Sequence, residues 1–160
     1  MDEAIQIRLL DVANEVAEEA VANGHHPFGA ILVAPDFKTI LLRQGNVDTV
    51  RHAETELARR SAREFSPEYL WDCCLVTTLE PCAMCSGTIY WANIGSVLYG
   101  TPESDLKALT GSDPRNPTME LPCRDVFAAG QKKVSVWGPL PAMKDALLAP
   151  HKRFWSQTYT

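Results

Sequence analysis

The stretch Thr78-Leu79-Glu80-Pro81-Cys82-Ala83-Met84-Cys85, with His52-Ala53-Glu54 upstream, decides how this 160-residue chain is interpreted. It places two thiols three residues apart, directly after a proline. One imidazole and two thiolates provide three protein ligands for a tetrahedral zinc ion and leave the fourth position for water. An open fourth position is typical of a catalytic zinc site rather than a structural one. We therefore predict one Zn²⁺ per chain, bound by His52, Cys82 and Cys85 together with a water or hydroxide.

Glu54 follows the predicted histidine ligand by two residues and is not needed to complete the ligand set. A carboxylate beside an activated water is suited to take its proton and pass it to a leaving group. We predict that Glu54 is the catalytic residue. The alternative is a structural zinc ribbon or knuckle with a fourth ligand from elsewhere. The candidates are His25, His26, Cys73, Cys74, Cys123 and His151, none of which repeats a tight ligand pair.

Apolar periodicity predicts five strands with helices between several of them, in a three-layer α/β/α sandwich. Strands are expected at 30–33, 39–42, 75–79, 96–99 and 134–137, and helices at 5–21, 52–62 and 82–92. The first two strands should form a hairpin. The polar, proline-rich segment 101–122 is expected to be a loop. We predict a single domain over residues 1–160.

The helix starts at positions 52 and 82 have a chemical consequence. Two helix N-termini would converge on the metal, where their dipoles favour thiolate over thiol. They would also favour the oxyanion formed when hydroxide attacks a ring carbon. The backbone amides of Cys82 and Ala83 are candidate donors to that oxyanion.

The composition suits a compact enzyme and shows no strong sign of nucleic-acid binding. Fifteen Lys and Arg against 20 Asp and Glu residues give a net charge of −5. The basic groups are short and scattered, which argues against a polynucleotide partner without excluding one. No apolar run approaches the roughly 20 residues of a membrane helix, so no membrane partner is expected.

The five cysteines favour a reducing, cytoplasmic setting, because their number is odd and two are assigned to zinc. Cys73 and Cys74 are adjacent, so in a strand they would point to opposite faces and could not easily bond each other. We expect both to be buried as small apolar side chains.

These motifs resemble those of the zinc-dependent cytidine and purine deaminase superfamily, in particular its guanine deaminase and tRNA adenosine deaminase branch. The matching pieces are Pro27-Phe28-Gly29-Ala30, Asn46, His52-Ala53-Glu54, the 78–85 run and Gly87-Thr88-Ile89-Tyr90-Trp91-Ala92. The resemblance implies a five-stranded mixed sheet, an obligate zinc and a homodimer. It also implies that Asn46 contacts the base, with Ala53, Phe28 and Trp91 near the wall of the pocket.

Three features favour guanine, each with a plainer explanation. Trp91 after a tyrosine resembles the free-guanine branch, but both aromatics could instead pack in a helix or at a dimer interface. The aromatic segment 151–155, with Trp155, could fold over a pocket and stack on a base, or form a helix docked on the core. Asp113 matches an acidic purine contact of guanine deaminases, but it also lies in an ordinary Gly-Ser-Asp-Pro turn.

The sequence therefore predicts hydrolytic deamination of a free nucleobase, best guess guanine, giving xanthine and ammonia. Only five residues separate Asn46 from His52, fewer than the resembled enzymes usually have. That difference keeps cytosine, another aminopurine or an aminotriazine open as substrates. Two further alternatives are wobble adenosine deamination in tRNA and, more remotely, a zinc-binding module without catalysis.

Overall fold

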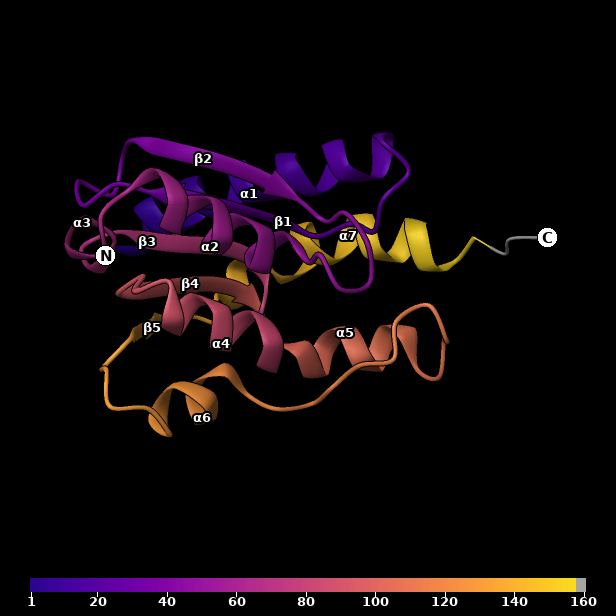
Figure 1. The fold of residues 1–160 in the computed structure, drawn as a ribbon. Helices are drawn as coiled ribbons and strands as arrows, with labels where there is room; N and C mark the ends of the chain where they lie inside the picture. The colour runs from indigo at the N-terminus through magenta and orange to yellow at the C-terminus, as the bar shows by residue number, and fades with distance from the viewer. Residues whose placement is uncertain (158–160) are drawn as a thin grey trace.

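The computed structural model describes residues 1–157, and its centre is a five-stranded mixed sheet with helices on both faces (Figure 1). The strands are β1 (Gly29–Val33), β2 (Ile40–Gly45), β3 (Cys74–Leu79), β4 (Ser96–Thr101) and β5 (Ser135–Trp137), in the order β2-β1-β3-β4-β5. β1 runs antiparallel to β2 and β3, whereas β3, β4 and β5 are parallel. The predicted fold class and all five strands are confirmed.

Two helical layers cover the sheet, as the alternation of side chains along β1 requires. Ala30 and Leu32 pack into the core beneath α2 (Ala53–Glu64) and α4 (Ala83–Trp91). Ile31 and Val33 pack into the other core, beneath α1 (Glu3–Ala22). Because both of its faces are buried, β1 is apolar throughout. Cys73 and Cys74 are buried in opposite cores, as the sequence predicts.

Gly29 allows α1 to lie very close to the start of β1. A Cβ atom built at this position would lie 2.3 Å from the carbonyl oxygen of Ala13 and 2.4 Å from the amide of Ala17. Only glycine leaves room for this approach. It brings the end of α1 and the segment 25–28 to the edge of the sheet where β3 ends.

The structure also contains helices that the sequence analysis did not predict or, for residues 151–155, offered only as an alternative. They are α3 (Pro67–Trp71), α5 (Glu103–Thr110), α6 (Cys123–Ala128), the 3₁₀ helix η1 (Pro141–Met143) and α7 (Lys144–Trp155). The prediction of a loop over 101–122 is wrong in its first half, which is α5. α5 is short and polar, and it is stabilised by the packing of Leu106 against α7, so tertiary contacts outweigh its weak local signal.

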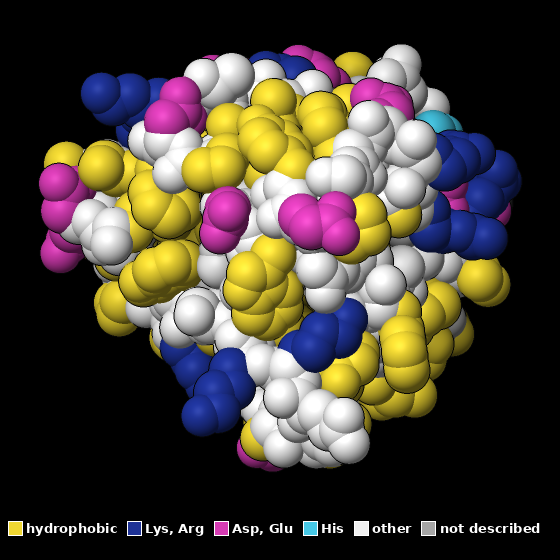
Figure 2. Space-filling model, turned by 60° about the vertical axis from the view of Figure 1, so that its left-hand side comes forward, with side chains coloured by type: hydrophobic (Ala, Val, Ile, Leu, Met, Phe, Trp, Pro, Cys, Tyr) yellow, Lys and Arg dark blue, Asp and Glu magenta, His cyan; other side chains and the backbone are white. Residues whose placement is uncertain are grey.

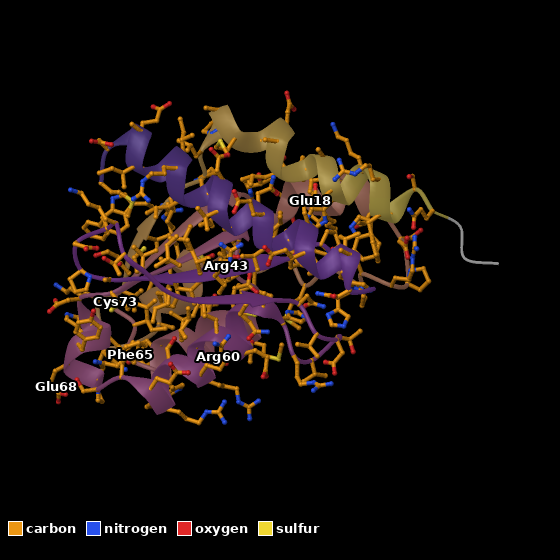
Figure 3. All side chains as sticks on the ribbon, turned by 90° about the horizontal axis from the view of Figure 1, so that it is seen from above. Glu18, Arg43, Arg60, Phe65, Glu68 and Cys73 are labelled. Carbon is orange, nitrogen blue, oxygen red and sulfur yellow. The ribbon has the colours of Figure 1, made fainter. Side chains whose placement is uncertain are left out.

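α7 and α1 lie side by side on one face of the sheet (Figure 3). Arg153 of α7 forms an ion pair with Glu18 of α1, and Leu147 packs with Leu9 and Leu10. The C-terminal aromatics therefore belong to a helix docked on the core, which is the plainer of the two explanations offered for residues 151–155.

The surface carries mixed charge. Figure 2 shows Lys and Arg side chains in separate groups on one face of the molecule, with no continuous basic stripe in that view. Among the helices of residues 1–157, none is long and apolar enough to cross a membrane.

Candidate active site

The predicted zinc ligands are brought together at two helix starts. His52 is the N-cap of α2, and Cys82 is the N-cap of α4, which begins where β3 ends. The Nδ1 atom of His52 lies 3.6 Å from Cys82 Sγ and 3.5 Å from Cys85 Sγ, and the two sulfurs are 3.5 Å apart. Ligand atoms of a tetrahedral zinc with bonds of about 2.0–2.3 Å lie roughly 3.3–3.8 Å apart. The three side chains are therefore positioned to bind a metal ion, and their donor set suits zinc.

The electrostatics of the three ligands favour a thiolate. The hydrogen bond between the two thiols lowers the pKa of Cys82 to about 4, and the bond to His52 adds to this effect. The same contact with Cys82 raises the pKa of His52 to about 9. His52 Nε2 donates to the carbonyl oxygen of Thr49 at 3.0 Å. This bond orients the ring and leaves Nδ1 directed at the two sulfurs.

Glu54 lies beside this cluster with only 4% of its surface exposed. Thr77 of β3 donates its hydroxyl to Glu54 Oε1 at 2.8 Å, while Oε2 lies 3.6 Å from Cys85 Sγ. Burial raises the pKa of Glu54, and the charge of Cys82 raises it further. The carboxyl group is thus fixed in orientation and disposed to hold a proton, as a proton shuttle requires. Sequence reasoning missed Thr77, which has no motif of its own.

A cavity of about 820 Å³ opens above these residues, with His52, Glu54 and Cys82 in its wall. Phe28, Ala83 and Met84 line it beside the metal ligands, and the segment 114–119 lines another part. The volume lies within the usual range for small-molecule sites. Phe28 thus lies in the cavity wall, and Ala83 lies there next to the ligand Cys82.

Two further carboxyl groups line the same cavity. Glu80, which is buried, accepts from the backbone amide of Glu103 at 3.2 Å and from that of Cys123 at 3.1 Å. It therefore ties the end of β3 to the first turns of α5 and α6. Burial raises the pKa of Glu103 to about 8, and Glu54 contributes to the shift. The sequence analysis missed Glu103, because it treated the segment as a loop.

Asn46 does not line this cavity, contrary to the expectation from the resemblance. Asn46 is buried, with 3% of its surface exposed. Its side-chain amide donates to the carbonyl oxygen of Asp48 at 3.3 Å. Asn46 instead lines a separate cavity of about 220 Å³ that also involves α1 and β2. Ala53 is buried as the first residue of α2, next to His52, and is likewise not among the described residues of the larger cavity.

Trp91 and Asp113 also lie differently from expectation. Trp91 is 81% exposed on the outside of α4, so it forms no part of the cavity wall among the described residues. Asp113 is held by Arg115, whose Nη2 lies 2.5 Å from Oδ2, and this bond lowers the pKa of Asp113 to about 2. Its carboxylate is therefore already paired with Arg115.

Trp155 lies behind the cavity rather than in its lining. Its ring is buried and packs edge-on against His26, with centroids 4.9 Å apart. Arg115 lies over the Trp155 ring at 5.3 Å and donates to its carbonyl oxygen at 3.0 Å. The C-terminal helix thus supports the cavity wall from outside.

The fold and the ligand set place the chain among zinc-binding deaminases. Residues 4–101 match the family model of the cytidine and deoxycytidylate deaminase zinc-binding region, so the chain belongs to this family. It is therefore a deaminase of the cytidine deaminase family. Its relatives include guanine deaminases and tRNA-specific adenosine deaminases.

Individual relatives differ in the substrate that their names state. The chain is 34% identical over 149 residues to a probable cytosine deaminase of Schizosaccharomyces pombe. The matched segment covers 89% of this chain and 88% of the relative. It is 40% identical over 83 residues to the guanine deaminase of Bacillus subtilis, covering 49% and 53% of the two chains. A solved guanine deaminase from Nitrosomonas europaea shares the fold, with a TM-score of 0.69 at 20% identity over 93% of this chain and 84% of that one.

Proposed function

We propose that the protein deaminates a free nucleobase, with guanine the best candidate, to give xanthine and ammonia. The observation that carries this proposal is the cavity, in which Glu54 lies beside the metal ligands and Glu103 lines the same space. Guanine presents its ring N1–H beside the amino group on the neighbouring carbon, and carboxyl groups are suitable acceptors for these N–H donors. With Asp113 engaged by Arg115, we assign that contact to Glu103, whose carbonyl oxygen accepts and whose O–H, retained because the pKa is raised to about 8, donates to a neighbouring acceptor of the base.

The chemistry divides between the metal and the chain. Bound by His52, Cys82 and Cys85, zinc would supply a water nucleophile whose pKa is lowered toward 7. Glu54 accepts the proton released as the water adds to the ring carbon, and delivers it to the adjacent ring nitrogen. It then takes the second proton from the hydroxyl group now on the ring carbon and passes it to the departing amine, so that ammonia leaves and a carbonyl remains. The backbone amides at Cys82 and Ala83 lie at the start of α4, where helical amides have no intrahelical partner, and they would stabilise the oxyanion.

The proposal is tested by measuring ammonia release from the zinc-loaded protein. The substrates are guanine, cytosine, adenine, their nucleosides, ammeline and a tRNA anticodon stem. We expect turnover of guanine or a closely related aminopurine. Turnover of the RNA alone would overturn the free-base assignment, and absence of turnover on every substrate would favour a zinc-binding module without catalysis.

Cytosine is the second candidate substrate. The relative that covers most of this chain is named a probable cytosine deaminase. If kcat/KM is higher for cytosine than for guanine, cytosine replaces guanine as the proposed substrate. The tRNA alternative is disfavoured by the net charge of −5, and it predicts strongly salt-sensitive RNA binding.

A homodimer is also part of the proposal. Met84 and Trp91 lie on the outward side of α4 and are 39% and 81% exposed. Trp91 contacts only Tyr90 and Lys132 among the described ring and cation contacts, Met84 also borders the cavity, and a second copy of the chain would bury the exposed part of both. Sedimentation equilibrium should show a dimer that Trp91→Glu weakens, and a monomeric wild-type protein would contradict it. A reducing, cytoplasmic setting remains proposed as well, because the two metal-binding thiols must stay reduced.

A further inference from the structure

We propose that His26 is a substrate-contacting residue that helps to determine which base this chain accepts. This inference rests on the proposed function, because it concerns the same cavity. His26 lies outside the motifs that define the metal site, in the short segment between α1 and β1. Its neighbour His25 lines the separate cavity with Asn46, so the two adjacent histidines serve different surfaces.

The position of His26 brings its imidazole to the cavity. The residue is half-buried and lines the same space as His52, Glu54 and Glu103. Its carbonyl oxygen accepts from the amide of Phe28 at 2.9 Å, which fixes the backbone turn. Among residues 1–157, no hydrogen bond engages the imidazole nitrogens of His26. Both nitrogens are therefore uncommitted within that part of the chain, and we assign them to a molecule bound in the cavity.

Aromatic packing holds the ring in place from behind. The centroid of the His26 ring lies 5.2 Å from Phe154 and 4.9 Å from Trp155, both in edge-on contact. Trp155 is itself fixed, because its Nε1 donates to His151 Nδ1 at 3.0 Å. A ring supported in this way loses little freedom when it binds a ligand, which is the property of a preorganised contact.

The charge state of His26 suits recognition of a neutral base. Burial lowers the pKa of His26, and Arg115, His52 and His25 lower it further, whereas Asp113 acts in the opposite direction. At neutral pH the imidazole is uncharged and offers one N–H donor and one acceptor nitrogen. This pair complements a ring edge that carries a carbonyl or ring nitrogen beside an N–H group. A site built to hydrogen-bond such an edge rejects rings that lack it.

Packing alone is the competing explanation for His26. A ring that only fills space between the cavity and the two aromatics of α7 needs no nitrogen atoms. His26→Phe keeps the ring and its edge contacts but removes the polar atoms, whereas His26→Asn keeps a donor and an acceptor. His25→Phe is the matched control, since it changes the adjacent histidine outside the active-site cavity.

The experiment measures kcat and KM of each variant on the base that wild type deaminates best and on one poorer base. Zinc content and the free energy of unfolding are measured in parallel. We expect His26→Phe to lose about tenfold in kcat/KM on the best base, mainly through KM, as for one lost hydrogen bond. The loss on the poorer base should be smaller, so selectivity falls. His26→Asn should recover part of the loss, and His25→Phe should stay within about twofold of wild type.

Binding of the base to Glu54→Gln protein gives a readout that does not depend on turnover. Calorimetry should show that adding His26→Phe to the Glu54→Gln protein weakens its affinity for the base by the same factor of roughly ten. If the Phe variant does not fold, His26→Ala is compared in the same way. Unchanged binding and selectivity in the folded His26 variants would overturn the role of His26 alone. If wild type deaminates no base and Glu54→Gln binds none, the proposed function fails and the role of His26 fails with it.

Discussion

The two sides of the active-site cavity are built in different ways. The metal side comes from two short motifs, each at the start of a helix, so that His52, Cys82 and Cys85 meet as soon as β3, α2 and α4 pack together. The opposite side gathers segments that are far apart along the chain. It comprises residues 26–28, the start of α5, the segment 114–119 and, behind them, α7.

We infer from this difference that the metal side carries the chemistry and the opposite side determines which substrate binds. On the metal side, local spacing fixes which atoms face one another, because a ligand and the N-cap of its helix are the same residue. On the opposite side, each position depends on a contact between distant elements, such as Glu80 with the amide of Cys123 or Arg115 with Trp155. We therefore expect changes on the metal side to remove activity outright, and changes on the opposite side to alter substrate binding by smaller factors.

The largest effect is expected from removing a metal ligand. Cys82→Ala should lose bound zinc and reduce turnover below detection, and the variant should unfold more readily because metal binding and folding are coupled. Elemental analysis, ammonia release and thermal unfolding measure these outcomes. Cys123→Ala is the control, since Cys123 also follows a proline and is buried, but lies outside the ligand cluster. Full zinc content in Cys82→Ala would refute the assigned ligand set.

Glu54→Gln should be the next largest change. The amide cannot shuttle a proton, so kcat should fall by about 10²–10⁴-fold, the usual contribution of a general acid–base group. Zinc content and fold should be retained, because Gln can still accept from the Thr77 hydroxyl. Glu64→Gln, at the exposed end of the same helix, should behave as wild type. Full activity in the Glu54→Gln enzyme would show that Glu54 is not the residue that carries the proton.

Sequence patterns predict the metal side well because its geometry follows from residue type and spacing. The C-x-x-C pair must share one face of a helix, and the apolar runs at β1 and β3 must be buried. The other side could not be predicted in the same way. Trp91 and Asp113 have the residue types of a purine contact, but only the packed structure shows that one points to solvent and the other is paired with Arg115.

Glu103 and His26 illustrate the converse, since neither belongs to a motif. Glu103 lies at the site because α5 begins at this residue. That helix in turn depends on its contact with α7. The ring of His26 is held at the cavity only because two aromatics near the far end of the chain, Phe154 and Trp155, pack against it. Tertiary contacts of this kind leave no local trace in composition or periodicity.

Arg115→Ala tests whether the opposite side is held together by a few long-range contacts. The change removes the pairing with Asp113 and the bonds to the carbonyl oxygens of Trp155 and Gln157. We expect KM to rise by about tenfold with kcat changed little, and stability to fall by about 1–2 kcal/mol, discounted for partial exposure.

The control for Arg115→Ala is Lys107→Ala. Lys107 forms an ion pair with Glu120 in the same region, but both side chains are about half exposed, at 49% and 50%. An exposed pair contributes less than about 1 kcal/mol, so this variant should show normal KM and nearly normal stability. Equal effects of the two substitutions would mean that Arg115 does not organise the cavity wall.

The smallest expected effect on activity at neutral pH concerns His151, which lies in α7 behind this wall. Burial lowers the pKa of His151 to about 3, whereas an unfolded chain has a histidine pKa near 6.5. Below about pH 6.5 the unfolded state therefore binds a proton that the folded state does not. The stabilising effect of the neutral imidazole is present above that pH and declines as the pH falls toward 3. The slope is at most about 1.4 kcal/mol per pH unit.

His151→Gln should flatten the stability profile between about pH 6 and pH 4 relative to wild type, as measured by urea unfolding at each pH. Gln can still accept from Trp155 Nε1, so the support of His26 by Trp155 is expected to persist at neutral pH. Selectivity at pH 7.5 should then remain normal in this variant, although its acid stability differs. Parallel profiles of stability against pH for the two proteins would show that His151 is not responsible for the loss of stability in acid. Altered selectivity at pH 7.5 would instead show that the cavity wall depends on the His151 ring itself, through its edge-on contact with Phe28 at 4.9 Å.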